Sequence, residues 1–237
     1  MDYFLKTYKA LCRQEFGIYG FRSYRKNFYR AVNDVYQSFC LHRSIYGTDC
    51  TVEFTVLPLC IGYPIDKSTC GPSHLKNFEG SFAWFPYDRR SKESIDACIA
   101  EMLAYMKKYL IPFFQASDCC KTAYDAIRQF ELQSHQNHRP DSPEKNFSLF
   151  SSVKAWIAVK NGDYALAARH FQEIERQTLD AMEYDRRMSG SDDQKKSSQN
   201  QKLADIREKI HMLLTGDEQR INSIVLANEH CSLQSLQ

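Results

Sequence analysis

The stretch NFYRAVNDVYQSFCLHRS, residues 27–44, decides the fold of this chain. Two runs rich in β-branched and aromatic residues, Asn27 to Val32 and Val35 to Ser44, flank the turn-forming pair Asn33-Asp34. Side chains of the second run alternate between two faces of a strand, one made of Val35, Gln37, Phe39 and Leu41 and the other of Tyr36, Ser38, Cys40 and His42. One face is therefore predicted to join a hydrophobic core.

The regions on either side extend this hairpin into an α+β domain. Helical spacing of apolar residues predicts one helix over Phe4 to Phe16. A third strand run, Thr51 to Gly62, predicts an antiparallel β-sheet meander in which Pro58 bulges the strand or ends its pairing. After a long loop over residues 62–80, Ser81 to Tyr87 is predicted to add a last short strand.

Every later element is predicted to be helical. Ser94 can cap a helix that Pro112 ends or kinks, and Asp118 can cap the next one. The polar stretch 135–146, which contains two prolines, predicts a boundary between an α+β domain, residues 1–139, and an all-α helical domain, residues 144–237. The polar stretch near 189–201 is predicted to be mobile, because it cannot bury apolar area.

A faint internal repeat predicts that the helical domain consists of helical hairpins. Asn161-Gly162-Asp163 opens one helix, and Thr215-Gly216-Asp217 opens another. The first opening resembles the turn and second helix of a tetratricopeptide unit. The repeat does not have the spacing of that family, so an array of such units is not predicted.

Composition is typical of a globular protein from a reducing compartment. Of 237 residues, 43% are hydrophobic and 25% are charged, unlike a disordered chain. No run of about 18 apolar residues indicates a membrane span, and residues 1–9 carry charges where a signal peptide has its apolar core. Nine cysteines without paired C-x-x-C spacing favour free thiols. A cytoplasmic protein outside the membrane is therefore expected.

Several short pieces of the chain occur in a characteristic order. They are Gly20-Phe21, Tyr24 to Arg30, Val35 to Phe39, Phe54 to Val56, Ile61-Gly62, Ala83 to Phe85 and Leu110 to Phe114. In this order and approximate spacing, residues 1–135 resemble a bacterial domain-of-unknown-function family, the type numbered 4304. The resemblance implies an antiparallel sheet backed by helices in a bacterial protein, and it implies no catalytic residue. The loop over residues 62–80 is longer than in that family.

The first hairpin combines basic and aromatic side chains. Tyr24, Arg25, Lys26, Tyr29 and Arg30 follow the pattern of a surface that stacks bases and holds phosphates. A hairpin with an aromatic core face and a basic solvent face gives the same pattern, and the net charge of the chain is only +2. We therefore prefer the structural interpretation to nucleic-acid binding, and we expect Arg25, Lys26 and Arg30 to lie in solvent.

Cysteine and histidine pairs are weak candidates for chemistry. Cys40 and His42, on one strand face, are candidates for a cysteine nucleophile and its base, and we prefer a half-buried structural thiol for Cys40. Cys70 with His74, or His135 with His138, could each supply two metal ligands. A tetrahedral metal site needs four ligands, which no regular spacing supplies, and the common nucleotide-binding and hydrolase motifs are absent from the sequence. No catalytic residue, metal or cofactor is therefore predicted.

The preferred hypothesis is a non-catalytic module that binds a protein partner. Trp84 and Phe85 would anchor that partner if they are exposed, although we expect their burial at a sheet edge instead. One version is an immunity-like protein that neutralises a toxin. Two other hypotheses stay open: nucleic-acid binding through residues 21–30, and an enzyme whose site is assembled from distant residues. A pocket that collects His42, His74, a cysteine and a carboxylate would favour the enzyme.

Overall fold

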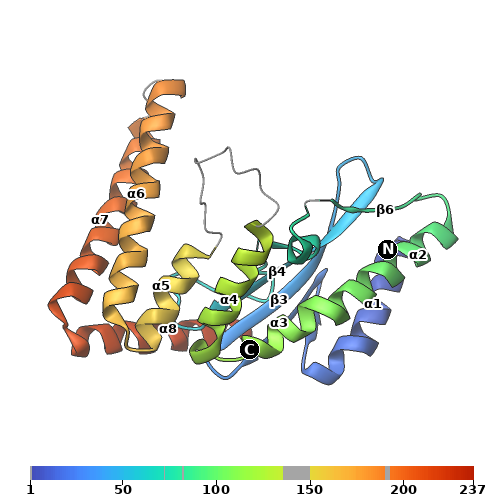
Figure 1. Ribbon diagram of the computed structural model, residues 1–237, viewed down its shortest axis with the longest axis horizontal. Helices are drawn as coiled ribbons and strands as arrows, with labels where there is room; N and C mark the ends of the chain where they lie inside the picture. Colours follow the sequence, from blue (N-terminus) through green and yellow to red (C-terminus); the bar gives the residue numbers. More distant parts are fainter. Residues whose placement is uncertain (1, 72, 82, 136–149, 190–192) are drawn as a thin grey trace.

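The computed structural model describes residues 2–71, 73–81, 83–135, 150–189 and 193–237, and it shows an α+β protein (Figure 1). The strands of its six-stranded sheet are β1 (Arg22–Tyr24), β2 (Asn27–Val32), β3 (Val35–Arg43), β4 (Asp49–Pro58), β5 (Ser73–His74) and β6 (Phe85–Pro86). The α-helices are α1 (Tyr3–Phe16), α2 (Lys92–Tyr105), α3 (Ile111–Ala116), α4 (Cys120–His135), α5 (Ser151–Lys160), α6 (Tyr164–Ser189), α7 (Asp193–Thr215) and α8 (Glu218–Leu236). Short helical turns are η1 (Gly17–Tyr19), η2 (Leu75–Glu79) and the π-helical turn η3 (Met106–Leu110).

The antiparallel meander predicted from the three strand runs is confirmed. β2 pairs with β3 only as far as Cys40, while β3 pairs with β4 as far as Arg43. β5 and β6 pair with successive parts of the other edge of β4. Pro58 ends β4, because it has no N–H to donate to a neighbouring strand. The β2–β3 turn places Asn33 in the left-handed region, with φ of 50°, which asparagine adopts more readily than most residues.

Helices α1, α3 and α4 cover one face of the sheet with an aromatic core. Phe39, one of the odd-numbered side chains of β3 that point to this face, is fully buried. Its ring lies against Phe16 of α1 at a centroid distance of 5.4 Å, and Phe54 of β4 lies against Phe130 of α4 at 5.3 Å. Since each buried phenyl ring stabilises the fold by roughly 1.5–3 kcal/mol, this face holds the helices to the sheet.

The segment that follows β4 covers the opposite face of the sheet. The Tyr36 hydroxyl donates to the carbonyl oxygens of Asp66 and Thr69 at 3.1 and 2.9 Å. The Ser38 hydroxyl donates to the Thr69 carbonyl at 2.7 Å. Most of β3 is therefore buried on both faces. The loop expected over residues 62–80 lies on the sheet, and it contains β5 and η2.

Two predicted helix caps are wrong. Ser91 caps α2, because its hydroxyl accepts from the Ser94 N–H at 3.1 Å, so Ser94 lies inside the first turn. The Asp34 carboxylate, in place of the expected Asp118, accepts from the Cys120 N–H at 2.8 Å at the start of α4. A contact 86 residues apart in the chain supplies this cap, which local sequence patterns do not reveal.

Pro112 does not end the helical stretch in which it lies. It occupies the first turn of α3, where its missing N–H removes no essential hydrogen bond. The preceding π turn, η3, joins α2 to α3 and keeps the chain helical. The sequence pattern that predicted a stop or a kink therefore marks a change of helix type.

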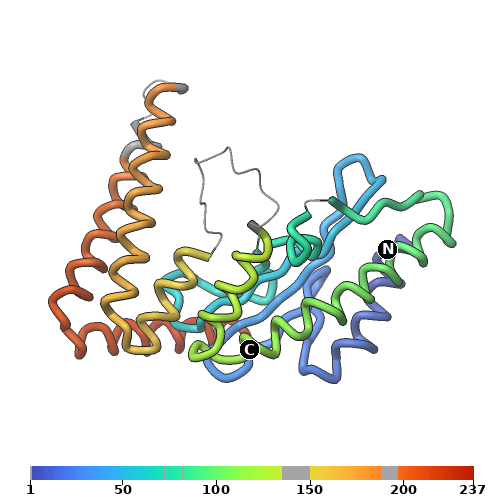
Figure 2. Tube along the Cα trace, viewed as in Figure 1, coloured from blue at the N-terminus to red at the C-terminus, as the bar shows by residue number. Residues whose placement is uncertain are grey.

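The C-terminal region consists of helical hairpins, as its repeat predicts. Gly162 and Gly216 have left-handed φ angles of 77° and 68°, which let the chain turn between helices. At Gly162 the chain reverses and α6 packs along α5, whereas at Gly216 α8 turns across the end of α7 (Figure 1). The carboxylates of Asp163 and Asp217 then cap α6 and α8. α6 and α7 run side by side and project away from the sheet (Figure 2). The polar stretch near residues 189–201 is helical from residue 193 onward.

Contacts join the C-terminal helices to the end of β4. The Asn228 side chain donates to the Cys60 carbonyl at 3.0 Å, and the Ser232 hydroxyl donates to the Leu59 carbonyl at 2.8 Å. One buried apolar cluster runs from the sheet through α5 and α8. Within the described ranges, each helix is too short or too polar to cross a membrane.

Candidate metal centre

Five side chains of the types that bind metal ions gather on the sheet face opposite α1. We call them the Cys/His/Glu cluster, which consists of Cys40, His42, Glu53, Cys70 and His74. Glu53 of β4 is the register partner of Cys40 in β3 and of His74 in β5, so these three residues form a row across the sheet. His42 lies two positions further along β3 on the same face, and Cys70 comes from the loop before β5.

Glu53 occupies the centre of the Cys/His/Glu cluster. Its Oε1 contacts Nδ1 of His42 and lies 3.8 Å from Nε2 of His74. Its Oε2 accepts from the Cys40 thiol at an Sγ–Oε2 distance of 3.6 Å, and the Cys70 thiol donates to its backbone carbonyl at 3.3 Å. The two Sγ atoms and a Glu53 carboxylate oxygen all lie within 4.8 Å of one another. Three atoms that can bind a metal thus converge on one small volume.

The cluster has a buried floor and a half-exposed rim. Cys40 is 2% exposed, whereas the side chains of His74 and His42 are 24% and 43% exposed. Trp84, predicted as a partner anchor, instead lies half-buried with its ring edge-on to both imidazoles, at centroid distances of 5.2 Å from His42 and 5.8 Å from His74. The Trp84 indole therefore covers part of the cluster. Solvent reaches the cluster at the half-exposed imidazoles of His42 and His74.

The electrostatics of the cluster disfavour an unassisted cysteine nucleophile. The hydrogen bond with Cys70 raises the pKa of the Cys40 thiol, and burial and the nearby Glu53 raise that pKa further. Burial lowers the pKa of His74, although Glu53 opposes this effect. Neutral imidazole is the form that binds metals, and a bound cation deprotonates a thiol that coordinates it. The arrangement therefore suits metal binding better than nucleophilic attack by Cys40.

Close packing on the sheet places Cys70 in the cluster. The Asp66 carboxylate accepts from the N–H and hydroxyl of Ser68 at 2.7 and 2.6 Å, which closes a turn just before Cys70. A Cβ atom at Gly71 would lie 2.7 Å from Cβ of Thr55 in β4. Glycine is therefore needed for the loop to approach the strand this closely.

The structure separates the residues predicted to bind a partner or nucleic acid. Tyr24, Arg25 and Lys26 lie exposed at the β1–β2 turn. Tyr29 and Phe85, in contrast, are 8% and 0% exposed and belong to the core. For Phe85, the expected burial at a sheet edge is confirmed. These residues do not form one continuous binding surface.

The expectation that Arg30 lies in solvent is wrong. Its guanidinium donates to the side-chain oxygen of Gln37 at 2.7 Å and to the Tyr19 carbonyl at 2.5 Å. It also lies over the Phe21 ring, 4.8 Å from the centroid. These contacts hold the Arg30 guanidinium against the protein. Arg30 therefore does not contribute to a basic surface at the hairpin tip.

The sequence indicated four of the five cluster residues, as two separate pairs, and did not indicate Glu53. The structure joins Cys40 and His42 with Cys70 and His74, through Glu53. The β3–β4 register was the signal that could have placed Glu53 beside Cys40. The third pair, at positions 135 and 138, falls outside the side chains that the structure describes.

The cluster unites two thiols, two imidazoles and one carboxylate from three strands and a loop. This set of donors is typical of zinc sites, in which cysteine, histidine and acidic side chains surround the ion. Comparison with protein-family models, with curated proteins and with solved structures finds no match for this chain.

Proposed function

We propose that the Cys/His/Glu cluster binds one zinc ion. The convergence of the Cys40 and Cys70 Sγ atoms with a Glu53 oxygen, all within 4.8 Å, carries this proposal. Ligands at a tetrahedral zinc ion, with Zn–S of about 2.3 Å and Zn–O of about 2.0 Å, lie about 3.5 to 3.8 Å apart. Side-chain shifts of about 1 Å would therefore bring these three atoms to the spacing of zinc ligands, and the His74 side chain would have to turn toward the two thiols to complete the site. Thiolate donors favour zinc over magnesium and calcium, which prefer oxygen ligands.

Four side chains supply the ligands in this proposal. Cys40, Cys70 and Glu53 are joined by His74, whose Nε2 lies 3.8 Å from the Glu53 carboxylate. His42 is a positioning residue, because its Nδ1 contacts Glu53 and holds the carboxylate toward the thiols. Four protein ligands make a closed site of the kind that stabilises a fold. The zinc ion would fasten the loop before β5 to the sheet. The cluster does collect His42, His74, two cysteines and a carboxylate, the set expected for an enzyme, but a zinc ion with four protein ligands has no open position for a substrate, so we propose a structural role.

The first test is zinc content and zinc affinity. We expect one zinc ion per chain by elemental mass spectrometry after desalting. Cys70→Ser and Cys40→Ser are each expected to weaken zinc binding by more than about 100-fold in competition with a chromophoric chelator. Losing a residue that merely orients a ligand already weakens metal binding by about 10- to 100-fold, and a thiolate ligand contributes more.

Cys231→Ser provides the matched control for this experiment. Cys231 is an exposed thiol on α8 and does not belong to the Cys/His/Glu cluster. This variant should keep one zinc ion and the affinity of the parent protein. The proposal fails if Cys40→Ser and Cys70→Ser retain zinc at the original affinity, or if Cys231→Ser loses zinc as they do.

A second candidate function, which we also propose for testing, is binding of a protein partner by the helical hairpins. Large apolar side chains are exposed there: Tyr184 on α6 is 63% exposed, Leu214 on α7 is 64% and Leu226 on α8 is 65%. Tyr184 and Leu214 lie at opposite ends of the α6–α7 hairpin, so Tyr184 is the candidate anchor, because tyrosine is enriched among the residues that dominate interfaces. All nine cysteines are free, which supports a cytoplasmic protein. An immunity-like protein that neutralises a toxin is one version of this function.

Affinity capture from extracts of the native host tests this second function. The parent protein is expected to retain one reproducible partner that Tyr184→Ser retains at least about tenfold less well, because exposed tyrosines frequently anchor interfaces. Tyr46→Ser, at a 77% exposed tyrosine of the β3–β4 turn, is the control and should retain the partner. Equal capture by all three proteins would exclude this part of α6 from the interface.

A further inference from the structure

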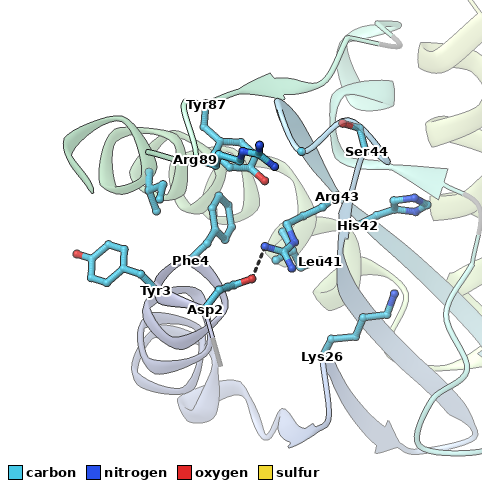
Figure 3. Close-up of a pocket in the computed structure, with 12 residues that line it drawn as sticks. Asp2, Tyr3, Phe4, Lys26, Leu41, His42, Arg43, Ser44, Tyr87 and Arg89 are labelled. Atoms are coloured by element: carbon cyan, nitrogen blue, oxygen red, sulfur yellow. Dashed lines mark hydrogen bonds and ion pairs between the residues drawn. The ribbon is translucent and has the colours of Figure 1, made fainter. Parts of the chain in front are cut away.

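A pocket of about 680 Å³ lies at the end of β3, beside the Cys/His/Glu cluster (Figure 3). Because β2 stops pairing at Cys40, the edge of β3 over residues 41–43 has no strand partner on that side among the described residues. Side chains from both faces of β3 therefore line the pocket: Leu41 and Arg43 from the face near α1, and His42 from the face of the cluster. Its volume is within the range of small-molecule sites, about 300 to 1,000 Å³.

Cations dominate the charged lining of this pocket. Lys26, Arg43 and Arg89 line it together with one carboxylate, that of Asp2. Arg43 donates to Asp2 at 2.6 Å, and a guanidinium has five N–H donors, so this contact leaves donors for a ligand (Figure 3). Within the described residues, Lys26 and Arg89 form no ion pair. Positive groups thus outnumber negative groups by two.

The remaining lining combines an apolar floor with a hydroxyl group. Phe4, Leu41 and Ile95 are buried beneath the pocket, and the ring of Tyr87 lies 4.8 Å from that of Phe4. The Ser44 hydroxyl is shielded from solvent and has no hydrogen-bond partner among the described residues. Because this oxygen is shielded, a ligand in the pocket would touch the apolar floor and the basic side chains and not the Ser44 hydroxyl.

We propose that this pocket binds a phosphate monoester with a small apolar ester group. Guanidinium groups bind phosphate oxygens through parallel hydrogen bonds, and an ammonium group adds a point charge. A phosphate monoester carries a charge of about −1.5 to −2 near neutral pH, which matches the excess of two cations better than a monocarboxylate does. The floor formed by Phe4, Leu41 and Ile95 accommodates the ester group.

The phosphate pocket and the zinc site are neighbours that can be tested separately. His42 belongs to both, because it lines the pocket and its Nδ1 contacts Glu53. Lys26, Arg43 and Arg89 are not among the proposed zinc ligands, so anion binding does not depend on zinc. Cys70→Ser, which removes a zinc ligand outside the pocket lining, should therefore bind the phosphate ester as the parent protein does.

Calorimetric titration of the full chain with phenyl phosphate tests the proposal. Saturable binding to one site is expected, and Lys26→Ala combined with Arg89→Ala should weaken it at least about tenfold, because each substitution removes a charge-assisted hydrogen bond. Arg90→Ala is the matched control, because Arg90 is an exposed neighbour outside the pocket lining. Benzoate, with one charge, and phenol, with none, should each bind at least about tenfold more weakly than phenyl phosphate.

Four results would overturn the proposal. They are no saturable binding of phenyl phosphate, equal affinity of the double variant and the parent, equal loss of affinity in Arg90→Ala, and phenol or benzoate binding as tightly as phenyl phosphate. Zinc content is measured on the same samples. In the parent protein, absence of zinc together with phenyl phosphate binding would contradict only the zinc proposal, and one zinc ion per chain without phenyl phosphate binding would contradict only the phosphate proposal.

Discussion

Replacing Phe54 with alanine is expected to lower the free energy of unfolding by about 3–5 kcal/mol. The Phe54 side chain is fully buried, and its ring lies 5.2 Å from Phe78, 5.6 Å from Phe113 and 5.3 Å from Phe130. Truncation removes apolar burial and leaves a cavity that these three rings cannot fill without moving. Urea denaturation followed by circular dichroism measures the change.

A surface variant separates this effect from a general sensitivity to the loss of aromatic rings. Tyr46→Ala removes a ring that is 77% exposed, so the free energy of unfolding should change by no more than about 0.5 kcal/mol. If Phe54→Ala were as stable as Tyr46→Ala, the aromatic core between the sheet and its helices would not be what holds this fold together.

Gly71→Ala is expected to reduce both stability and zinc affinity. Its Cβ would lie 2.7 Å from Cβ of Thr55 and 2.8 Å from the backbone oxygen of Phe54, and the backbone of a paired strand cannot easily move away. Overpacking of this kind costs about 1–3 kcal/mol. Because Cys70 is the adjacent residue, the displaced loop should also weaken zinc binding by at least about tenfold.

Gly17→Ala is the matched control for Gly71→Ala. A Cβ at Gly17 would meet no atom within 4 Å, and its φ of −59° suits any residue. Alanine there should leave zinc affinity unchanged and either leave stability unchanged or raise it by about 0.4–1 kcal/mol. Unchanged stability and zinc affinity in Gly71→Ala would show that the loop before β5 does not need its close contact with β4.

The elements whose signals lie within a short stretch of sequence could be predicted. Alternation along β3 and the apolar spacing of α1 depend on neighbouring residues, as do the turns at Gly162 and Gly216. The cap of α4 could not be predicted in this way, because Asp34 reaches Cys120 across 86 positions. The resemblance of residues 1–135 to the type-4304 family stays a prediction.

Only part of the candidate metal centre could be predicted from the sequence, because its residues come from distant parts of the chain. Strand alternation placed Cys40 beside His42, and the spacing of Cys70 and His74 suggested two ligands. Glu53 had no local signal, and only the β3–β4 register placed it opposite Cys40. Hydrogen bonds from the Tyr36 and Ser38 hydroxyls of β3 to the carbonyls of Asp66 and Thr69 hold the loop on the sheet, which brings the two pairs together.

Arg30 shows where a charge pattern misleads. The alternation of basic and aromatic residues in the first hairpin predicts cations in solvent, because burying an unpaired charge is costly. Gln37 lies directly opposite Arg30 in the β2–β3 ladder, and its side-chain oxygen accepts the guanidinium at 2.7 Å. A cross-strand partner therefore makes a half-buried position tolerable, which the sequence of the hairpin does not reveal.

X-ray absorption at the zinc edge of the zinc-loaded protein tests whether the Cys/His/Glu cluster binds the zinc ion. We expect two sulfur ligands at about 2.3 Å, from Cys40 and Cys70, and two nitrogen or oxygen ligands at about 2.0 Å, from His74 and Glu53. In Cys70→Ser loaded with excess zinc, the sulfur shell should fall to one ligand. A spectrum without sulfur ligands, or one that Cys70→Ser leaves unchanged, would show that the Cys/His/Glu cluster does not bind zinc as proposed.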